Sequence, residues 1–578
     1  MPLSPTSVSP SVLVVGAGPV GSVLALTLLK NGIPVRIIDK AGPQIGQKGA
    51  GIQPRSLEMH HFLGTLPDFL DVGKALPPCT VYKIPGGTEI LKTFELIPYE
   101  EPRPDIPYNN AVLLGQHRQQ SILHRHLEKY GCEVEFHTEL RSFKQYDDHV
   151  LATITKRSSD GTEVPEEIKV PYVVGADGAH STIRRTLGLT FLGDTRDDVN
   201  MVIGDIEVKS GLDRKSWHLW GGGSAKMQIM DTDFVWTRAT LIPTEVDDNI
   251  FTMIIAGNEI DHAKTVSGHD ELVKTITSIT DRNDIEFGDL VWMSRYRPNI
   301  RMVNKFGEGR VFVAGDAAHV HSPTGGQGTN SGVQDSFNLG WKLALVLKGF
   351  SPPSLLDTYT EECLPVIAAM LDKSTFLLNR GLEKPPSDND NWTRGAEFKQ
   401  LGINYRGSST LVDETTDLTK DLIRSDSYSL ASDGVVHAGD RAPEAPGLEV
   451  LHSDGNFTTM TSLFDIFKPD HHTVLIFSSV RYKGEEITSR LSGYFKGLFK
   501  TVLILRALSE SELIASVKQS SGFDLVLRDG GGHAYKGYPA LPGSCTVVVV
   551  RPDGIIGAIV GGVDGLRQYL SGVFLASK

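Results

Sequence analysis

Three glycines near the start of the chain have the spacing of a phosphate-binding turn. Gly16, Gly18 and Gly21 form the pattern G-x-G-x-x-G directly after the apolar run Val12–Val15, and apolar residues recur at helical spacing over 20–29. The first glycine permits a tight turn, the second lets a pyrophosphate approach the backbone, and the third lets helix and strand pack closely. The helix N-terminus offers N–H groups and a positive dipole to phosphates. The pattern predicts a strand–turn–helix unit that binds a dinucleotide.

An acidic residue completes this unit. Asp39 follows a second apolar run, Val35–Ile38, and lies 23 residues beyond Gly16. A carboxylate at that place accepts hydrogen bonds from the ribose hydroxyls of an adenosine and disfavours a 2′-phosphate. The unit fits both NAD and FAD, so it leaves the choice between them open.

A second stretch, residues 309–349, combines an acid with a run of glycines. Val311–Ala314 predicts a short strand, Asp316 follows it, and the loop SPTGGQGTN, residues 322–330, leads into a long helix. The hydroxyls of a sugar-alcohol chain would satisfy a buried Asp316. Successive backbone N–H groups and the helix N-terminus would stabilise negative charge on a reduced flavin ring. The two stretches predict two half-sites for one large cofactor.

A third motif, GADGAHSTIRR at residues 175–185, lies between these stretches. With the three motifs in this order, the sequence resembles the single-component FAD-dependent aromatic hydroxylases, which include phenol hydroxylase and p-hydroxybenzoate hydroxylase. The motifs frame about the first 380 residues, and the last 140 resemble the thioredoxin-like tail of the phenol hydroxylase branch.

The resemblance implies roles for individual residues. Asp316 would bind the ribityl chain, the loop from Pro323 to Asn330 would line the isoalloxazine ring, Gln116 would touch FAD, and Asp177–Gly178 would shape the groove for FAD and NADPH. The residues expected at the cofactor are Gly16, Gly18, Pro19, Gly21, Asp39, Lys40, Lys48, Gln116, Asp177, Gly178, Asp316, Gly326, Gln327, Gly328, Thr329 and Asn330.

Two positions depart from the family pattern. Lys48 stands where the family usually has an arginine, and Ala50 stands where phenol hydroxylase has an aspartate that serves the substrate. The resemblance therefore assigns no certain catalytic acid or base. Pro323, Arg301 and Tyr296 are the candidates for a place near the flavin or substrate.

The implied activity is hydroxylation of a phenolic or related aromatic compound by a flavin C4a-hydroperoxide, with O₂ and NADPH, or NADH, as co-substrates. The chain has one dinucleotide fingerprint, so we expect the pyridine nucleotide to bind transiently. One alternative is an epoxidase or ring-expanding oxygenase that acts on a polyketide or terpenoid. Another is an NAD-dependent dehydrogenase, which would leave Asp316 and its loop unexplained.

Composition argues against several other classes of function and location. A net charge of −13 argues against broad binding to nucleic acid or to an anionic membrane surface. The four cysteines are scattered without metal-ligand spacing, and His319 and His321 have no third ligand candidate nearby, so we expect no metal. The polar N-terminus lacks the features of a secretory signal. We expect a cytoplasmic enzyme with a small aromatic substrate, and the sequence leaves a monomer and a homodimer both open.

The expected fold class is α/β: a Rossmann-type FAD-binding domain with an inserted β-sheet substrate domain, followed by a thioredoxin-like α/β domain. That last domain should be redox-inactive, because Ser478, Ser479 and Val480 stand where a cysteine pair would follow its first strand. The expected division is a FAD-binding domain over 11–190, to which about 80–107 adds a substrate-domain segment; a substrate domain over 191–284; the second part of the FAD domain over 285–383; a linker over 384–436; and the thioredoxin-like domain over 437–578.

Overall fold

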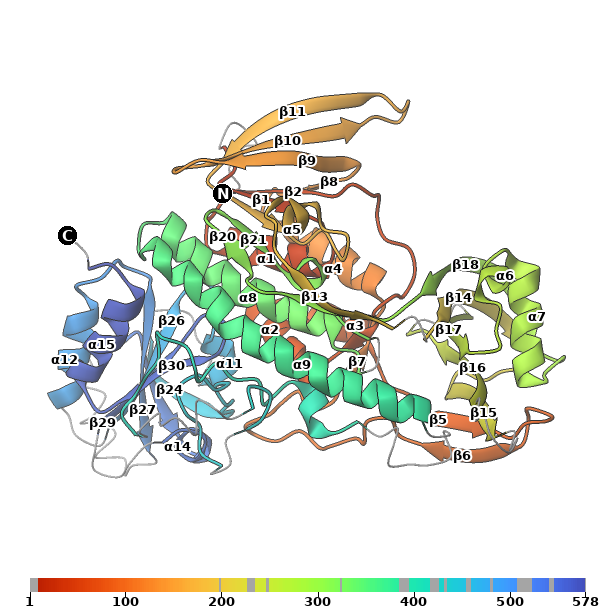
Figure 1. The fold of residues 1–578 in the computed structure, drawn as a ribbon. Coiled ribbons are helices and arrows are strands. Elements are labelled where there is room, and N and C mark those ends of the chain that lie inside the picture. The colour runs from red at the N-terminus through yellow and green to blue at the C-terminus, as the bar shows by residue number, and fades with distance from the viewer. Residues whose placement is uncertain are drawn as a thin grey trace.

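A computed structural model gives the arrangement of the chain. It describes residues 9–196, 199–225, 234–245, 249–322, 325–383, 394–415, 426–430, 434–453, 459–478, 482–506, 522–539 and 545–576. Figure 1 shows a central body, a mainly antiparallel sheet to its right and the blue C-terminal part to its left. No helix among the described residues is long and apolar enough to cross a membrane.

The central body is built on a mainly parallel sheet whose apolar strands are buried on both faces. The strand–turn–helix–strand unit expected from the first glycine motif forms as predicted, with α1 (Pro19–Lys30) between β1 and β2. This is the Rossmann-type arrangement. The strands in spatial order are β20 (Gly307–Glu308), β21 (Val311–Val313), β12 (Tyr172–Gly175), β1 (Val12–Val15), β2 (Val35–Ile38) and β8 (Val134–Glu135).

The inserted sheet has seven strands and a core of its own, formed around Trp220 and Phe251 and covered on one face by α7 (His269–Thr280). It takes strands from both predicted substrate segments, about 80–107 and 191–284, and it also includes β18 (Glu286–Tyr296), which lies within the stretch predicted to belong to the FAD domain. Pairing of β18 with β14 explains this difference, because that antiparallel ladder is long. The strands in order are β18 (Glu286–Tyr296), β14 (Met201–Ser210), β17 (Ile250–Gly257), β16 (Phe234–Pro243), β15 (Trp217–Ala225), β5 (Cys79–Tyr82) and β6 (Ile90–Phe94).

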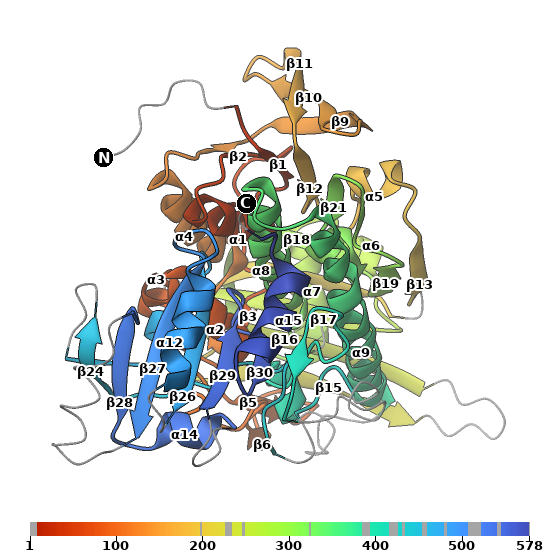
Figure 2. The same cartoon turned by 90° about the vertical axis from the view of Figure 1, so that its left-hand side faces the viewer.

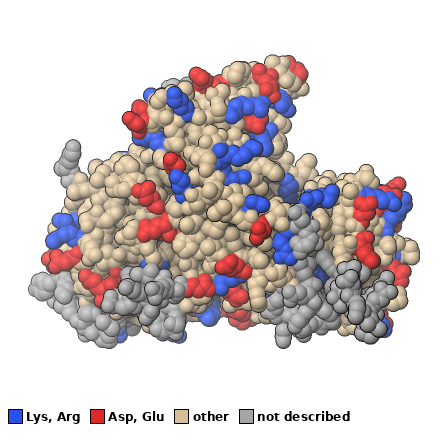
Figure 3. Space-filling view, viewed as in Figure 1, with Lys and Arg blue, Asp and Glu red and all other residues tan. Residues whose placement is uncertain are grey.

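Three antiparallel strands form the top of the molecule in Figure 1: β9 (Thr138–Gln145), β10 (Val150–Arg157) and β11 (Glu163–Val170). Basic and acidic side chains are interspersed on this part of the surface (Figure 3). Arg141 and Arg157, for example, both pair with Glu163.

The C-terminal part contains a sheet of its own with helices α12 (Tyr482–Leu491) and α15 (Val563–Val573) packed against it (Figure 2). Its central strands β26, β27 and β28 run parallel to one another. Strand β29 runs antiparallel to both of its neighbours, β26 and β30, and β30 pairs in parallel with β23. The thioredoxin-like assignment and the domain boundaries stay predictions. Ser478 ends β26, and Ser479 and Val480 lie outside the described residues. The strands in order are β23 (Val412–Asp413), β30 (Ile556–Val560), β29 (Cys545–Val550), β26 (His472–Ser478), β27 (Phe499–Arg506), β28 (Leu525–Asp529), β24 (Leu448–Ser453) and β25 (Met460–Thr461).

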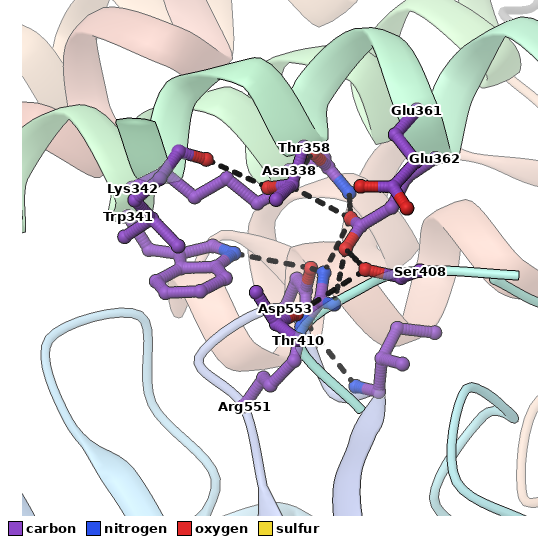
Figure 4. Close-up of polar contacts among 12 residues, drawn as sticks. Asn338, Trp341, Lys342, Thr358, Glu361, Glu362, Ser408, Thr410, Arg551 and Asp553 are labelled. Carbon is purple, nitrogen blue, oxygen red and sulfur yellow. Dashed lines mark hydrogen bonds and ion pairs between the residues drawn. The ribbon is translucent and has the colours of Figure 1, made fainter. Parts of the chain in front are cut away.

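Two long helices join the central body to the C-terminal part: α8 (Gly328–Leu347) and α9 (Asp357–Glu383). Between them a carboxylate, Glu362, is fully enclosed (Figure 4). It accepts hydrogen bonds from both terminal nitrogens of Arg551, at 2.8 and 2.9 Å, and from Lys342 at 2.7 Å. Asn338 and Ser408 donate to it as well, at 2.6 and 2.7 Å.

The same arginine continues the network into the C-terminal part. Arg551 also pairs with Asp553, which accepts a hydrogen bond of 3.1 Å from the indole of Trp341 on α8. Arg55 of α2 (Pro54–Leu63) donates to the backbone carbonyl of Asp553 at 2.8 Å. Charged groups so deeply enclosed are tolerated because each is paired and hydrogen-bonded.

Glu362→Gln should lower the free energy of unfolding by about 3–5 kcal/mol, since it removes the acidic partner of the enclosed Lys342 and leaves the enclosed Arg551 paired with Asp553 alone. Burial by itself raises the pKa of a carboxyl, but Arg551 and Lys342 hold the pKa of Glu362 below its ordinary 4.5. A depressed folded-state pKa gives stability above pH 4.5 that is lost as the pH falls below it.

Urea unfolding at several pH values measures both effects. The exposed neighbour Glu361, changed to Gln, is the matched control, and it should lose less than about 1 kcal/mol. Equal losses at the two positions would contradict the prediction.

Candidate active site

One cavity of about 900 Å³ links the two predicted half-sites to the inserted sheet. Its lining includes Gly16 and Asp39, Asp316 and residues 326–330, and Trp292 of the inserted sheet. The parallel strands and the inserted sheet thus converge on a single space. We call residues 325–330 the glycine loop.

The surroundings of the three fingerprint glycines agree with the roles expected for them in the turn, in phosphate binding and in helix packing. A Cβ on Gly16, whose φ is +104°, would lie 2.1 Å from the Ala176 carbonyl oxygen, and one on Gly21 would lie 1.9 Å from that of Gly16. A Cβ on Gly18 would meet only Gln120, at 3.6 Å, on the cavity side. Gly16 and Gly21 therefore serve the packing of turn and helix, and Gly18 leaves room for a phosphate beside α1. Pro19 is the first residue of α1 and is buried.

Backbone hydrogen bonds orient the Asp39 carboxylate in a way that suits a ribose. Its two carboxylate oxygens accept the backbone N–H groups of Ala17 and Ala41 at 2.8 and 2.9 Å, and each oxygen keeps a further lone pair for a hydroxyl. Lys40 and Lys48 also line the cavity and are exposed. Partial burial lowers the pKa of Lys48.

Asp316 lies in a short turn after β21, with its side chain exposed to the cavity. The sequence predicts a buried acid at this position, but the short turn points the side chain into the open space of the cavity. Desolvation by the surrounding protein raises the pKa of this carboxyl. No described residue donates a hydrogen bond to it, so its oxygens suit the hydroxyls of a ribityl chain.

The glycine loop faces the cavity mainly with its backbone. The side chain of Gln327 points away from the cavity and donates to the carbonyls of Gly325 and Phe398, at 2.8 and 3.0 Å. The amide of Asn330 bridges to Gly51 and Gln53 at 2.8 Å each. These side chains shape the loop, so ring contacts would come from backbone N–H groups. Gly326, Gly328 and Thr329 also line the cavity.

Three further expected residues line the cavity. Asp177 accepts the N–H of Thr182 at 2.7 Å, and so caps α5 (Thr182–Thr186), while its other oxygen is buried without a partner in the described part of the chain. The neighbouring Gly178 takes a left-handed φ of +78°. Gln116 begins α4 (Gln116–Glu128) at the cavity wall.

The three substrate-side candidates differ in position. Tyr296 lines the cavity, and its hydroxyl donates to the carbonyl of His321 at 3.1 Å. Arg301 is not among the described residues that line the cavity, because β19 (Asn299–Val303) turns it toward β13 (Phe191–Thr195), where it donates to the Phe191 carbonyl at 3.2 Å. Pro323 lies outside the described residues.

The two histidines of the HxH pair have partners in the protein. His319 Nε2 donates to the carboxylate of Asp335 at 2.7 Å, and His321 Nδ1 donates to the Ser322 carbonyl at 2.6 Å. Burial lowers the pKa of His321 to about 4, so this imidazole is neutral near pH 7.

The inserted sheet is anchored where it forms the cavity wall. Asp205 of β14 accepts the backbone N–H of Gln47 at 2.7 Å and the indole N–H of Trp292 at 2.5 Å. Glu245 accepts the side-chain amide of Gln47 at 2.6 Å and the N–H of Gly115 at 3.2 Å. Two buried carboxylates thus tie this sheet to the loops that surround the cavity.

Sequence reasoning missed Arg394, which lies in the predicted linker. Its guanidinium lines the cavity, and a Cβ on Gly326 would lie 4.0 Å from Nη1. Nε is buried without a hydrogen-bond partner among the described residues, and burial lowers the pKa of Arg394 to about 10. No sequence pattern distinguishes this arginine from surface ones, because its place depends on how residues 394–400 pack against the glycine loop.

These residues fit FAD: room beside Gly18, an anchored Asp39, an exposed Asp316 carboxylate and a loop that presents backbone N–H groups. Asp316→Ala should abolish FAD retention, because it removes the acceptor for the ribityl hydroxyls. The ratio of flavin to protein absorbance after purification measures this, and thermal unfolding of the apoprotein shows whether the fold persists. Asp316→Asn, which keeps an acceptor oxygen, should retain part of the FAD. Full flavin content in the Ala variant would refute the assignment.

Comparison with known proteins agrees with this geometry. Residues 9–374 match the family model described as FAD binding domain. A flavin-dependent monooxygenase of Mycobacteroides abscessus is 35% identical over 477 residues, which is 81% of this chain and 89% of the relative. Pentachlorophenol 4-monooxygenase of Sphingobium chlorophenolicum is 28% identical over 96% of this chain and 94% of its own.

Solved structures share the fold. The flavin-dependent monooxygenase PieE, in complex with FAD and substrate, superposes with a TM-score of 0.76 at 20% identity over 98% of both chains. Aklavinone-11 hydroxylase, with FAD and aklavinone, gives 0.73 at 22% identity over 98% of this chain and all of that one. The family match covers more than half of the sequence. The chain therefore belongs to the FAD binding domain family, and the protein is a FAD-dependent monooxygenase.

Proposed function

We propose that the protein hydroxylates a phenolic or related aromatic compound with NADPH and O₂. The observation that carries the proposal is the continuity of the cavity, in which the expected flavin positions and an aromatic wall from the inserted sheet share one space. Bound FAD supplies the redox chemistry: reduction by NADPH and activation of O₂. The chain's own residues have to hold the ring, exclude water and present charge.

The wall of the inserted sheet suits a planar aromatic ring. The part of the cavity lining that comes from the inserted sheet includes Trp217, Trp292, Ile203 and Ile254. The indole N–H of Trp217 is buried without an acceptor in the described part of the chain. A substrate oxygen would satisfy this donor, while the apolar side chains would exclude water from the ring.

Arg394 supports a phenol as the reacting group. Ala50, which also lines the cavity, cannot act as the base that an aspartate would provide. A nearby guanidinium lowers the pKa of a bound phenol and so favours its phenolate, the more electron-rich form of the ring. Electrostatic stabilisation by Arg394 would then replace proton abstraction by a side chain at position 50.

The relatives support an aromatic substrate without specifying which. Two of the proteins compared above take their names from pentachlorophenol and aklavinone. NADPH use implies the cytoplasm, and the four cysteines, all buried and without disulfides, agree with that location. The NAD-dependent dehydrogenase alternative is excluded by the family match.

A true substrate should accelerate reduction of the bound flavin by NADPH by orders of magnitude. Anaerobic stopped-flow absorbance measures this rate with and without a panel of phenols, salicylates and polycyclic aromatic compounds. Mass spectrometry should then find one added oxygen in an aerobic product. Rapid reduction whichever compound is present, with an epoxide or enlarged ring as product, would favour the alternative oxygenase instead.

Arg394→Met should raise the pKa of a bound phenol by about one to three pH units, because it removes the cation that stabilises the phenolate. Spectral titration of enzyme-bound 4-nitrophenol measures this, since its phenolate absorbs in the visible. Arg394→Lys keeps the charge and is the control. An unchanged phenol pKa in the Met variant would remove Arg394 from the proposal.

A further inference from the structure

Gln400 combines complete burial with an unusual backbone. It follows the short 3-10 helix Ala396–Lys399, is 0% exposed and has a φ of +63°. A non-glycine residue in this left-handed region is strained and is retained where the surrounding structure enforces it. The hydrogen bonds of its side chain are what hold Gln400 in this conformation.

The amide of Gln400 joins the glycine loop to the first turns of α8. Nε2 donates to Gln327 Oε1 at 2.8 Å and to Ser331 Oγ at 3.3 Å. Oε1 accepts from Gln334 Nε2 at 2.7 Å. Tyr428 also donates to Gln327 Oε1, at 2.6 Å, and lies 3.1 Å from Gln400 Nε2. One side chain thus contacts a loop residue and two residues of the helix.

The conformation of the glycine loop depends on residues 398–400, which contact it on the side away from the cavity. Gly325 and Gly326 take φ values of +99° and +63°, and a Cβ on Gly325 would lie 3.1 Å from the ring of Phe398. Gln327 connects this turn to Gln400 and to the Phe398 carbonyl. The backbone N–H groups that face the cavity are therefore oriented by residues 398–400, which lie outside the cofactor motifs.

The network is also electrically neutral. It consists of three glutamines, a serine and a tyrosine, and burial raises the pKa of Tyr428, which keeps its hydroxyl protonated. The first turn of α8 contains no acidic residue. A carboxylate among these groups would cancel the partial positive charge of the helix N-terminus. Neutral amides hold the loop without cancelling this partial positive charge. The helix dipole can therefore stabilise negative charge on a reduced flavin.

We propose that Gln400 is a positioning residue that holds the glycine loop and the N-terminus of α8 against the flavin and thereby raises the reduction potential of bound FAD. The proposal rests on FAD binding and is independent of the substrate class proposed above. No substrate is needed to test it, so the two can fail separately.

Gln400→Gly is the most informative variant, because glycine adopts the left-handed φ without strain and removes only the side chain. The midpoint potential of the purified FAD-loaded protein, measured by equilibration with a reference dye, should fall. We expect the preference for reduced over oxidised FAD to drop about tenfold, which for a two-electron couple is about 30 mV. Tyr428→Phe, which removes one donor to Gln327, should shift the potential in the same direction by less.

Asn404→Ala is the matched control. Asn404 is a buried amide of the same segment, but its side chain donates to the carbonyls of Gly402, Asp426 and Ser429 rather than to the loop. It should lower stability and leave the potential unchanged. An unaltered potential in folded, FAD-loaded Gln400→Gly, or an equal fall in Asn404→Ala, would overturn the proposal.

Discussion

The pairing of Glu362 with Arg551 is the interaction on which the assembly of the parts depends. It unites α9, α8 and the C-terminal sheet around one carboxylate, far from water. Each charge is costly to enclose and is tolerated only with all of its partners in place. The network therefore favours a single relative position of helices and sheet, which a merely apolar interface would specify less strictly.

Helix α8 transmits this constraint to the active site. Its 20 residues span about 30 Å, with Trp341 and Lys342 in the charged network toward one end and the glycine loop at the other. Along its length Gly340 and Gly332 pack closely against Thr27 and Val20 of α1, which carries the fingerprint. The C-terminal part therefore supports the cofactor site although it does not line the cavity in the described structure.

The described residues between 394 and 430 show that local composition does not reveal which residues become buried at a site. Prolines and charges around this segment suggested a linker, yet Arg394 reaches the cavity and Gln400 and Tyr428 are enclosed behind the glycine loop. Their partners lie about 60 to 100 residues away in sequence. Isolated polar residues without periodicity carry no local signal of such contacts, because burial depends on the folded neighbours.

The sequence by itself determined the elements that follow local rules. The G-x-G-x-x-G turn, the strands on either side of it and the acid at Asp39 are specified by backbone geometry and alternation over short ranges, and all form as expected. Tertiary structure alone decided which groups face the cavity. Asp316 points into it, Arg301 points away, and the side chain of Gln327 turns to Gln400, because side-chain direction is set by packing between segments distant in the chain.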